Sequence, residues 1–139
     1  MVDALETTLA WALLSDDLQL QTGGQIATRH KFGDGWELPS QALQLRYDGG
    51  TPDLYTDRQV VRLEARCYGA DQSEAAQVYA ALVALTRATE RERVQTAEGF
   101  ALLYWLNLVS GPSFFVDPDA GVDALLCFLE ACVSETDIP

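Results

Sequence analysis

Residues 57–85 constrain the fold of this chain more than any other stretch, because they carry the patterns of a strand, a turn and a helix in direct succession. The first part, DRQVVRLEARCYG, alternates apolar and polar side chains with the two-residue period of a β-strand that is wet on one face. The apolar positions are Val61, Leu63, Ala65 and Cys67, and the polar ones are Arg62, Glu64, Arg66 and Tyr68. The sequence therefore predicts one amphipathic strand of a sheet.

This strand leads into a tight turn and a capped helix. Gly69 and Ala70 turn the chain, and Asp71 with Glu74 three residues later has the spacing of a capping box, with Asp in place of the usual Ser or Thr. We expect a helix from Asp71 to about Thr89. Spacings of three and four place an apolar stripe against the sheet, formed by Ala75, Val78, Leu82 and Leu85. The run VYAALVAL is wider than this stripe needs, which indicates burial on a second side, against the N-terminal helix or a neighbouring subunit.

The rest of the chain carries the patterns of one more helix and three more strands. Residues 2–15 are typical of an amphipathic helix, and residues 42–47 of a strand that pairs antiparallel with the strand above. Segments 100–109 and 122–133 predict a β-hairpin joined by the turn GPSFFVDPDAG. The glycine-rich residues 16–39 are expected to be mostly loop. We predict a single α+β domain over residues 1–139, an antiparallel sheet of about four strands with two helices packed on one face.

Charge limits the partners that the chain can have. The formal net charge is −12, from 21 acidic and nine basic residues. Binding nucleic acid requires Lys and Arg to replace phosphate counterions, so we do not expect this chain to wrap DNA. The same acidic charge would suit a conduit through which DNA slides without binding. The longest apolar runs are far shorter than the roughly 20 residues that cross a bilayer, and the acidic N-terminus is unlike a signal peptide. We expect no membrane partner and no export.

The residues with reactive side chains do not form a catalytic or metal-binding pattern. Cys67, Cys127 and Cys132 are an odd number without a close pair in the sequence, which is typical of reduced, buried thiols. His30 is the single histidine. Counting residues does not exclude a catalytic Ser/His/Asp triad, but no serine lies in a GxSxG motif. DPDAG begins like a calcium loop without its later ligands, and no glycine doublet has phosphate-loop spacing. We predict no catalytic residue, no metal and no cofactor.

Three arginines stand out on the amphipathic strand. Arg58, Arg62 and Arg66 are spaced by four, which places them on one face, with Glu64 between the last two. One interpretation is a wet sheet face with weak ion pairs across the strands. The other is a subunit interface in which the acidic surface of a second copy meets the arginines. Arg58, Arg62, Glu64 and Arg66 are the candidate interface residues.

The order of these motifs resembles a family of phage proteins. GGTPD (49–53), a strand ending in RCYGA (66–70), an alanine-rich helix and a hairpin around GPSFFVDPDAG (111–121) resemble the tail terminator or tail completion proteins of long-tailed bacteriophages, also called minor tail or minor capsid proteins. The similarity runs from about residue 43 to residue 135. Residues 19–39 match nothing in the family.

The resemblance implies a structural role and not catalysis. Copies would form a ring, commonly a hexamer, at the head-proximal end of the tail tube, where they end tube polymerisation and dock to the head connector. The expected partners are further copies of the chain, the tail tube protein and the connector, with DNA passing through the lumen. The protein would be assembled in the host cytoplasm and reside in the virion. The alternatives are a neck or head completion protein and, from another class, a small cytosolic ligand-binding domain or enzyme.

Overall fold

The computed structural model describes residues 3–28, 40–52, 58–97, 99–117 and 122–135. These residues form three helices and six strands. The helices are α1 (Ala4–Leu13), α2 (Asp16–Thr22) and α3 (Gln72–Ala88). The strands are β1 (Ile26–Ala27), β2 (Ala42–Pro52), β3 (Arg58–Tyr68), β4 (Glu92–Thr96), β5 (Gly99–Asp117) and β6 (Val122–Glu135).

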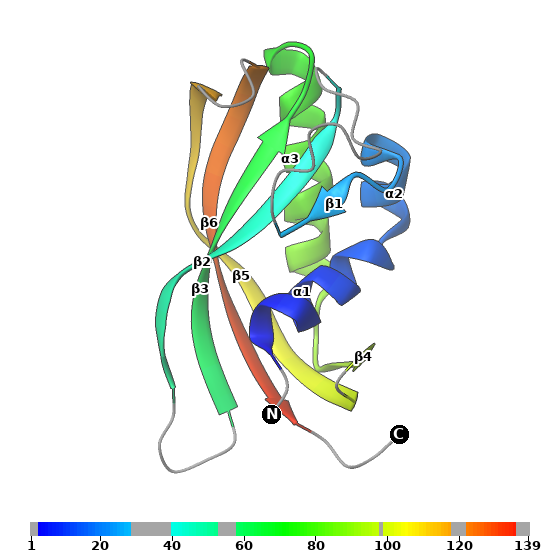
Figure 1. Ribbon diagram of the computed structural model, residues 1–139, viewed down its shortest axis with the longest axis vertical. Helices are drawn as coiled ribbons and strands as arrows, with labels where there is room; N and C mark the ends of the chain where they lie inside the picture. Colours follow the sequence, from blue (N-terminus) through cyan, green and yellow to red (C-terminus); the bar gives the residue numbers. More distant parts are fainter. Residues whose placement is uncertain (1–2, 29–39, 53–57, 98, 118–121, 136–139) are drawn as a thin grey trace.

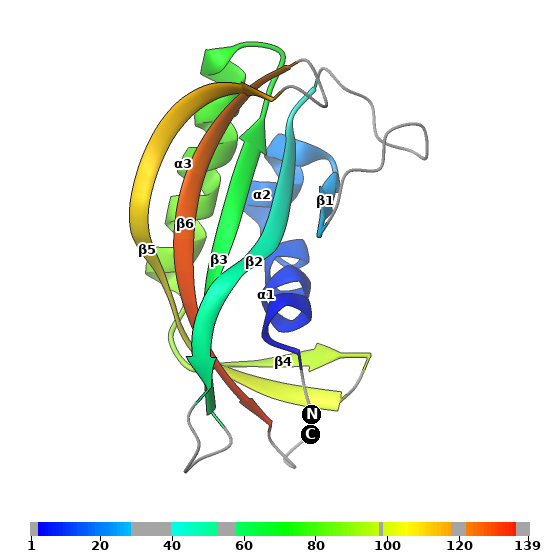
Figure 2. The ribbon, with the colours of Figure 1, turned by 60° about the vertical axis from the view of Figure 1, so that its left-hand side comes forward.

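One sheet in the order β1-β2-β3-β6-β5-β4 carries the fold. Its neighbouring strands are antiparallel except for β1 and β2, which are parallel. The sheet is strongly twisted and curves around the helices, which lie together on one side of it (Figures 1 and 2). The other side of the sheet, called the outer face below, carries no helix of the described residues.

The expected sheet of about four antiparallel strands with two helices is wrong, because the sheet is mixed and larger and a third helix joins it. The missed elements are β1, β4 and α2. β1 has two residues and α2 has seven, and segments this short show no clear period in a sequence. β4 begins in the charged segment ERER (90–93), and Val94 is its single buried residue. β1 pairs with β2 and α2 packs on α3, and both partners are distant in sequence. β4 pairs with β5, which follows it directly.

The amphipathic strand and the following helix form as the sequence predicts. On the helix-facing side of β3, Leu63, Ala65 and Cys67 are fully buried. The Asp71 carboxylate caps α3 by accepting a hydrogen bond from the Glu74 amide at 2.9 Å. The buried side chains of α3 include the predicted stripe: Ala75, Val78, Ala81, Leu82 and Leu85.

Gly69 makes the sharp turn between β3 and α3 possible. A Cβ atom at this position would lie 2.4 Å from the Ala75 nitrogen and 2.6 Å from the Glu74 Cβ. Such contacts are far inside van der Waals distance, so a side chain would push the start of α3 away from the sheet. The glycine therefore fixes how closely the helix follows the strand.

α1 is tied to the sheet and to α3 by two side-chain contacts. Asp3 caps α1 by accepting from the amides of Leu5 and Glu6, and the Tyr47 hydroxyl on β2 donates to the same carboxylate at 2.6 Å. At the other end, the Trp11 indole donates to the Thr89 hydroxyl just beyond α3 at 2.9 Å. The expected docking of an N-terminal helix on the sheet is confirmed.

β5 and β6 pair as the expected hairpin, but β5 extends further along the chain than expected. GPSFFVD, the first seven residues of the predicted turn, belongs to β5. The backbone bulges at Gly111, whose φ is 111° and whose Cβ would lie 2.8 Å from the Cys127 Cα on β6. Glycine therefore lets β5 continue through a segment with turn chemistry. Residues 118–121, which hold most of DPDAG, lie outside the described residues, as do His30 and residues 33–35.

Candidate subunit interface

The three arginines of β3 lie together on the outer face, as the spacing predicts. Each guanidinium stacks over an aromatic ring of β6, the neighbouring strand, or of β5, the strand beyond it. The distances from the guanidinium carbon to the ring centroid are 5.7 Å for Arg58 and Tyr104, 4.8 Å for Arg62 and Phe128, and 5.4 Å for Arg66 and Phe115. Stacking on a ring orients a guanidinium and leaves its donors directed sideways and outward.

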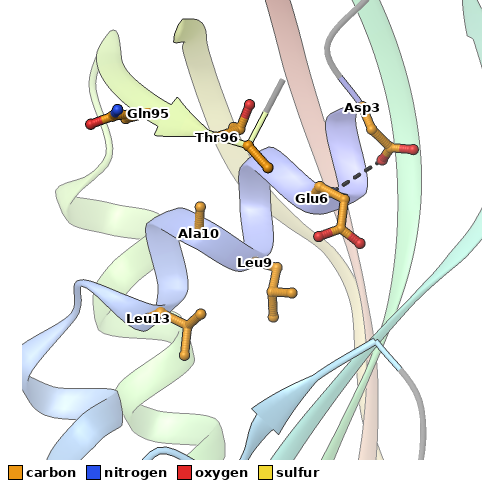
Figure 3. A pocket seen from close by; sticks show the side chains of 8 residues that line it. Asp3, Glu6, Leu9, Ala10, Leu13, Gln95 and Thr96 are labelled. Carbon is orange, nitrogen blue, oxygen red and sulfur yellow. Dashed lines mark hydrogen bonds between the residues drawn. The ribbon is translucent and has the colours of Figure 1, made fainter. Parts of the chain in front are cut away.

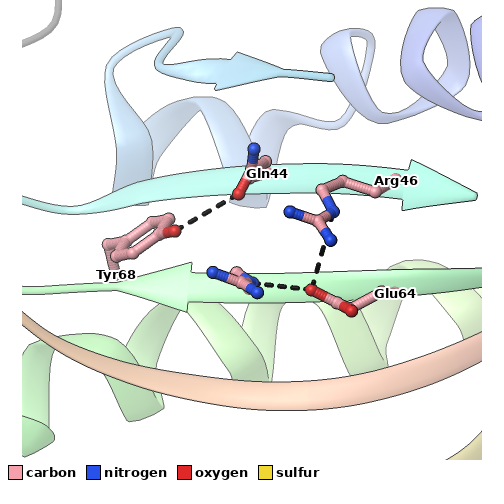
Figure 4. Close-up of polar contacts among 5 residues, drawn as sticks. Gln44, Arg46, Glu64 and Tyr68 are labelled. Carbon is pink, nitrogen blue, oxygen red and sulfur yellow. Dashed lines mark hydrogen bonds and ion pairs between the residues drawn. The ribbon is translucent and has the colours of Figure 1, made fainter. Parts of the chain in front are cut away.

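Acidic side chains pair with these arginines along the same face. Glu64 accepts from Arg66 at 2.6 Å and lies 3.8 Å from Arg46 on β2 (Figure 4). Arg62 forms an ion pair with Asp48 at 3.2 Å. Burial alone would lower the pKa of Arg66, but hydrogen bonds with Glu64 and Tyr68 outweigh it and hold this pKa above its usual value. The Arg66–Glu64 pair is thus part of the folded sheet.

Burial separates the two ends of the arginine row. The side chains of Arg66 and Glu64 are 18% and 14% exposed, whereas those of Arg62 and Asp48 are 43% and 40% exposed. Arg58 is also exposed. The accessible part of the candidate interface is therefore the end that carries Arg58 and Arg62.

The outer face is not exposed to solvent along its whole length. Tyr68, which the alternation placed on the wet face, is fully buried, and its hydroxyl donates to the Gln44 side chain at 3.2 Å (Figure 4). It belongs to a small apolar cluster with Ala42, Val122 and Ala124. The sequence could not indicate this cluster, because its members come together only through the pairing of β2, β3 and β6.

A second surface lies on the helix side of the molecule, between α1 and β4. It is a groove of about 480 Å³ (Figure 3). Its lining includes the N-cap residue Asp3, the α1 residues Glu6, Leu9 and Leu13, and the β4 residues Gln95 and Thr96. Glu6, Leu9 and Leu13 follow helical spacing and form one stripe of α1. The groove therefore has an acidic end and an apolar end.

All three cysteines are free and buried, as expected from their number and spacing. The pairing of β3 with β6 brings together Cys67 and Cys127, which the sequence did not indicate as a pair. A hydrogen bond with Cys127, together with complete burial, raises the pKa of the Cys67 thiol. Within the described residues, no three His, Cys, Asp or Glu side chains gather as a metal site would require.

Comparisons with known proteins give a structural likeness without a sequence family. No family model matches the chain, and no curated protein matches it. Among solved structures, one similar chain belongs to the "Virion of native gene transfer agent (GTA) particle", with a TM-score of 0.58 and 14% sequence identity. The match covers 93% of this chain and 94% of that chain. The two chains thus share a fold over nearly their whole length. None of the described helices is long and apolar enough to span a membrane.

Proposed function

We propose that this protein is a virion structural protein that ends the growth of a tail tube and joins the tail to the head. The observation that carries the proposal is the fold shared with a virion chain over nearly the full length of both. The motif order that resembles tail terminator proteins supports the finer assignment. A role in assembly also fits the row of arginines stacked on aromatic rings, because Arg and aromatic side chains are enriched at protein interfaces.

The mechanism is capping by a ring. A tube built from head-to-tail contacts has no intrinsic end, so a different protein must close it. A ring of identical small domains does this by repeating one contact around the tube, and it presents a new surface to the head connector. The exposed end of the arginine row, Arg58 and Arg62, supplies a contact between neighbouring copies. The net charge of −12 lets DNA pass through the ring without binding to it.

Deleting the protein from the particle that encodes it tests the proposal. We expect heads that package DNA, alongside tails that are overlong or unattached, when lysates are imaged by negative stain. Supplying the protein in trans should restore tails of normal length. Leaking heads with tails of normal length would instead assign the chain to the neck, and particles of normal appearance would contradict any role in assembly.

A further inference from the structure

The two surfaces described above lie on opposite sides of the molecule. The arginine row is on the outer face of the sheet, and the groove between α1 and β4 is on the side that carries the helices (Figures 1 and 3). Contacts between different surfaces of identical subunits are heterologous, and they close into a ring when the rotation between copies allows it. A subunit with complementary surfaces on its two sides is suited to this arrangement.

The charges of the two sides are complementary. Residues 1–28, which include α1 and α2, contain four acidic side chains and no Lys, Arg or His: Asp3, Glu6, Asp16 and Asp17. On the outer face, six arginines of the described residues accompany three acidic side chains, although the chain as a whole has more than twice as many acidic as basic residues. These arginines are Arg46, Arg58, Arg62, Arg66, Arg91 and Arg93, and the acids are Asp48, Glu64 and Glu130. The outer face is thus the least acidic side of an acidic molecule.

The groove also matches the arginine row in its apolar part. Leu13, which lines the apolar end, is 39% exposed, and Leu14 next to it in the chain is 67% exposed, so apolar surface is accessible there. The Asp3 carboxylate already accepts hydrogen bonds from α1 and Tyr47, so Glu6 is the acid best placed to meet an incoming cation. A guanidinium resting on an aromatic ring offers both a charge for Glu6 and an apolar surface for the leucines.

We propose that the groove between α1 and β4 of one copy receives the Arg58 and Arg62 end of the outer face of the next copy. The inference rests on the proposed function, because it names the counter-surface for the contact that repeats around the ring. Glu6 of one copy pairs with Arg62 of its neighbour, and Leu9 and Leu13 pack against the rings beneath the arginines.

Charge exchange tests the pairing in particles that lack the natural protein. Glu6→Arg and Arg62→Glu, supplied singly, should each reduce the number of particles with capped, attached tails at least about tenfold, because like charges then face each other. Carrying both changes in one chain, or supplying the two single variants together, should restore most of these particles. In a ring of the double variant, and in an even-numbered ring in which the two single variants alternate, every contact again joins an acid to an arginine.

Matched controls separate pairing from changes in net charge and folding. Glu90→Arg and Arg87→Glu change the charge equally at exposed positions outside both surfaces, and they should leave the particles intact. Thermal melts of each purified variant verify that it folds. Single variants that cap normally, or exchanges that fail to restore capping, would overturn the pairing and leave the proposed function standing. Normal tails in the deletion strain itself would overturn the proposed function.

Discussion

The two faces of β3 differ in burial and in their expected roles. On the helix-facing side, Leu63, Ala65 and Cys67 are completely buried under α3 and the rest of the core. On the outer face, Arg62 sits on an aromatic ring with 43% of its side chain exposed. Exposing the apolar side chains of the buried face to water would be unfavourable, so this face determines the fold. The outer face keeps charges accessible at modest cost, which leaves it available for assembly.

The largest effect is expected from a charge placed against the buried face. Leu82 of α3 is 1% exposed within the core, so Leu82→Asp would place an unpaired carboxylate there, and we expect a loss of about 3 to 5 kcal/mol in the free energy of unfolding. Ala84→Asp, two residues along at an exposed position of the same helix, is the control. Urea unfolding of both variants gives the comparison. A Leu82→Asp protein as stable as the control would show that α3 does not cover the sheet.

A smaller loss is expected where α3 begins. Asp71→Ala removes the carboxylate that accepts the Glu74 amide, and it should lower the free energy of unfolding by about 1 kcal/mol. Ser73→Ala changes an exposed residue of the same first turn without touching the cap and should have little effect. Equal melts for the two variants would show that the cap contributes nothing to docking α3 on β3.

Local signals explain how much of this fold could be predicted from the sequence. β3 and α3 were predicted because alternation, helical spacing and the Asp71 cap all lie within short windows. β1 and α2 were missed because each is short and gains its stability from partners distant in the chain. β4 was missed because its five residues begin with charged side chains and are too few to show a clear alternation, although its partner β5 follows directly. The path of β5 through Pro112 was missed because proline and glycine normally signal a turn, and only pairing with β6 keeps the strand continuous.

Only the local part of the candidate site could be predicted, for the same reason. The spacing of Arg58, Arg62 and Arg66 showed that they share a face. Their aromatic partners, Tyr104, Phe115 and Phe128, lie on β5 and β6, and the register between these strands cannot be read from residue patterns. The burial of Tyr68 and the contact of Cys67 with Cys127 depend on that register as well. Long-range pairing, and not local chemistry, limited the sequence prediction.

High pH offers a test of the contact that ties α1 to the sheet. Partial burial of Tyr47, which is 45% exposed, and then the hydrogen bond to Asp3 raise its pKa from 10.0 to about 12. A raised pKa favours the neutral phenol in the folded state, so this contribution to stability is complete below pH 10 and is lost as the pH rises through 12.

Tyr47→Phe should therefore weaken the dependence of stability on pH in this range. The other tyrosines and the cysteines titrate in the same range, so the difference in slope between the variant and the natural protein isolates the contribution of Tyr47. Urea unfolding between about pH 9 and pH 11.5 measures it, with Tyr104→Phe as the control that removes a phenol elsewhere. An identical slope for Tyr47→Phe and the natural protein would contradict the role of this hydrogen bond.

The smallest effect on stability is expected on the outer face, where the comparison between the two faces is sharpest. Arg58→Glu with Arg62→Glu removes two exposed stacking contacts and one exposed ion pair, and such contacts are worth at most about 1 kcal/mol each. The melting temperature should thus change little, whereas capping of tail tubes should be lost, since oriented charges at an interface control docking. Arg87→Glu, at an exposed position of α3, is the control for a charge reversal away from this face. A loss of stability as large as that of Leu82→Asp would mean that the arginines hold the sheet together. The outer face would then belong to the fold as much as the buried face does, and its role in assembly would lose its physical basis.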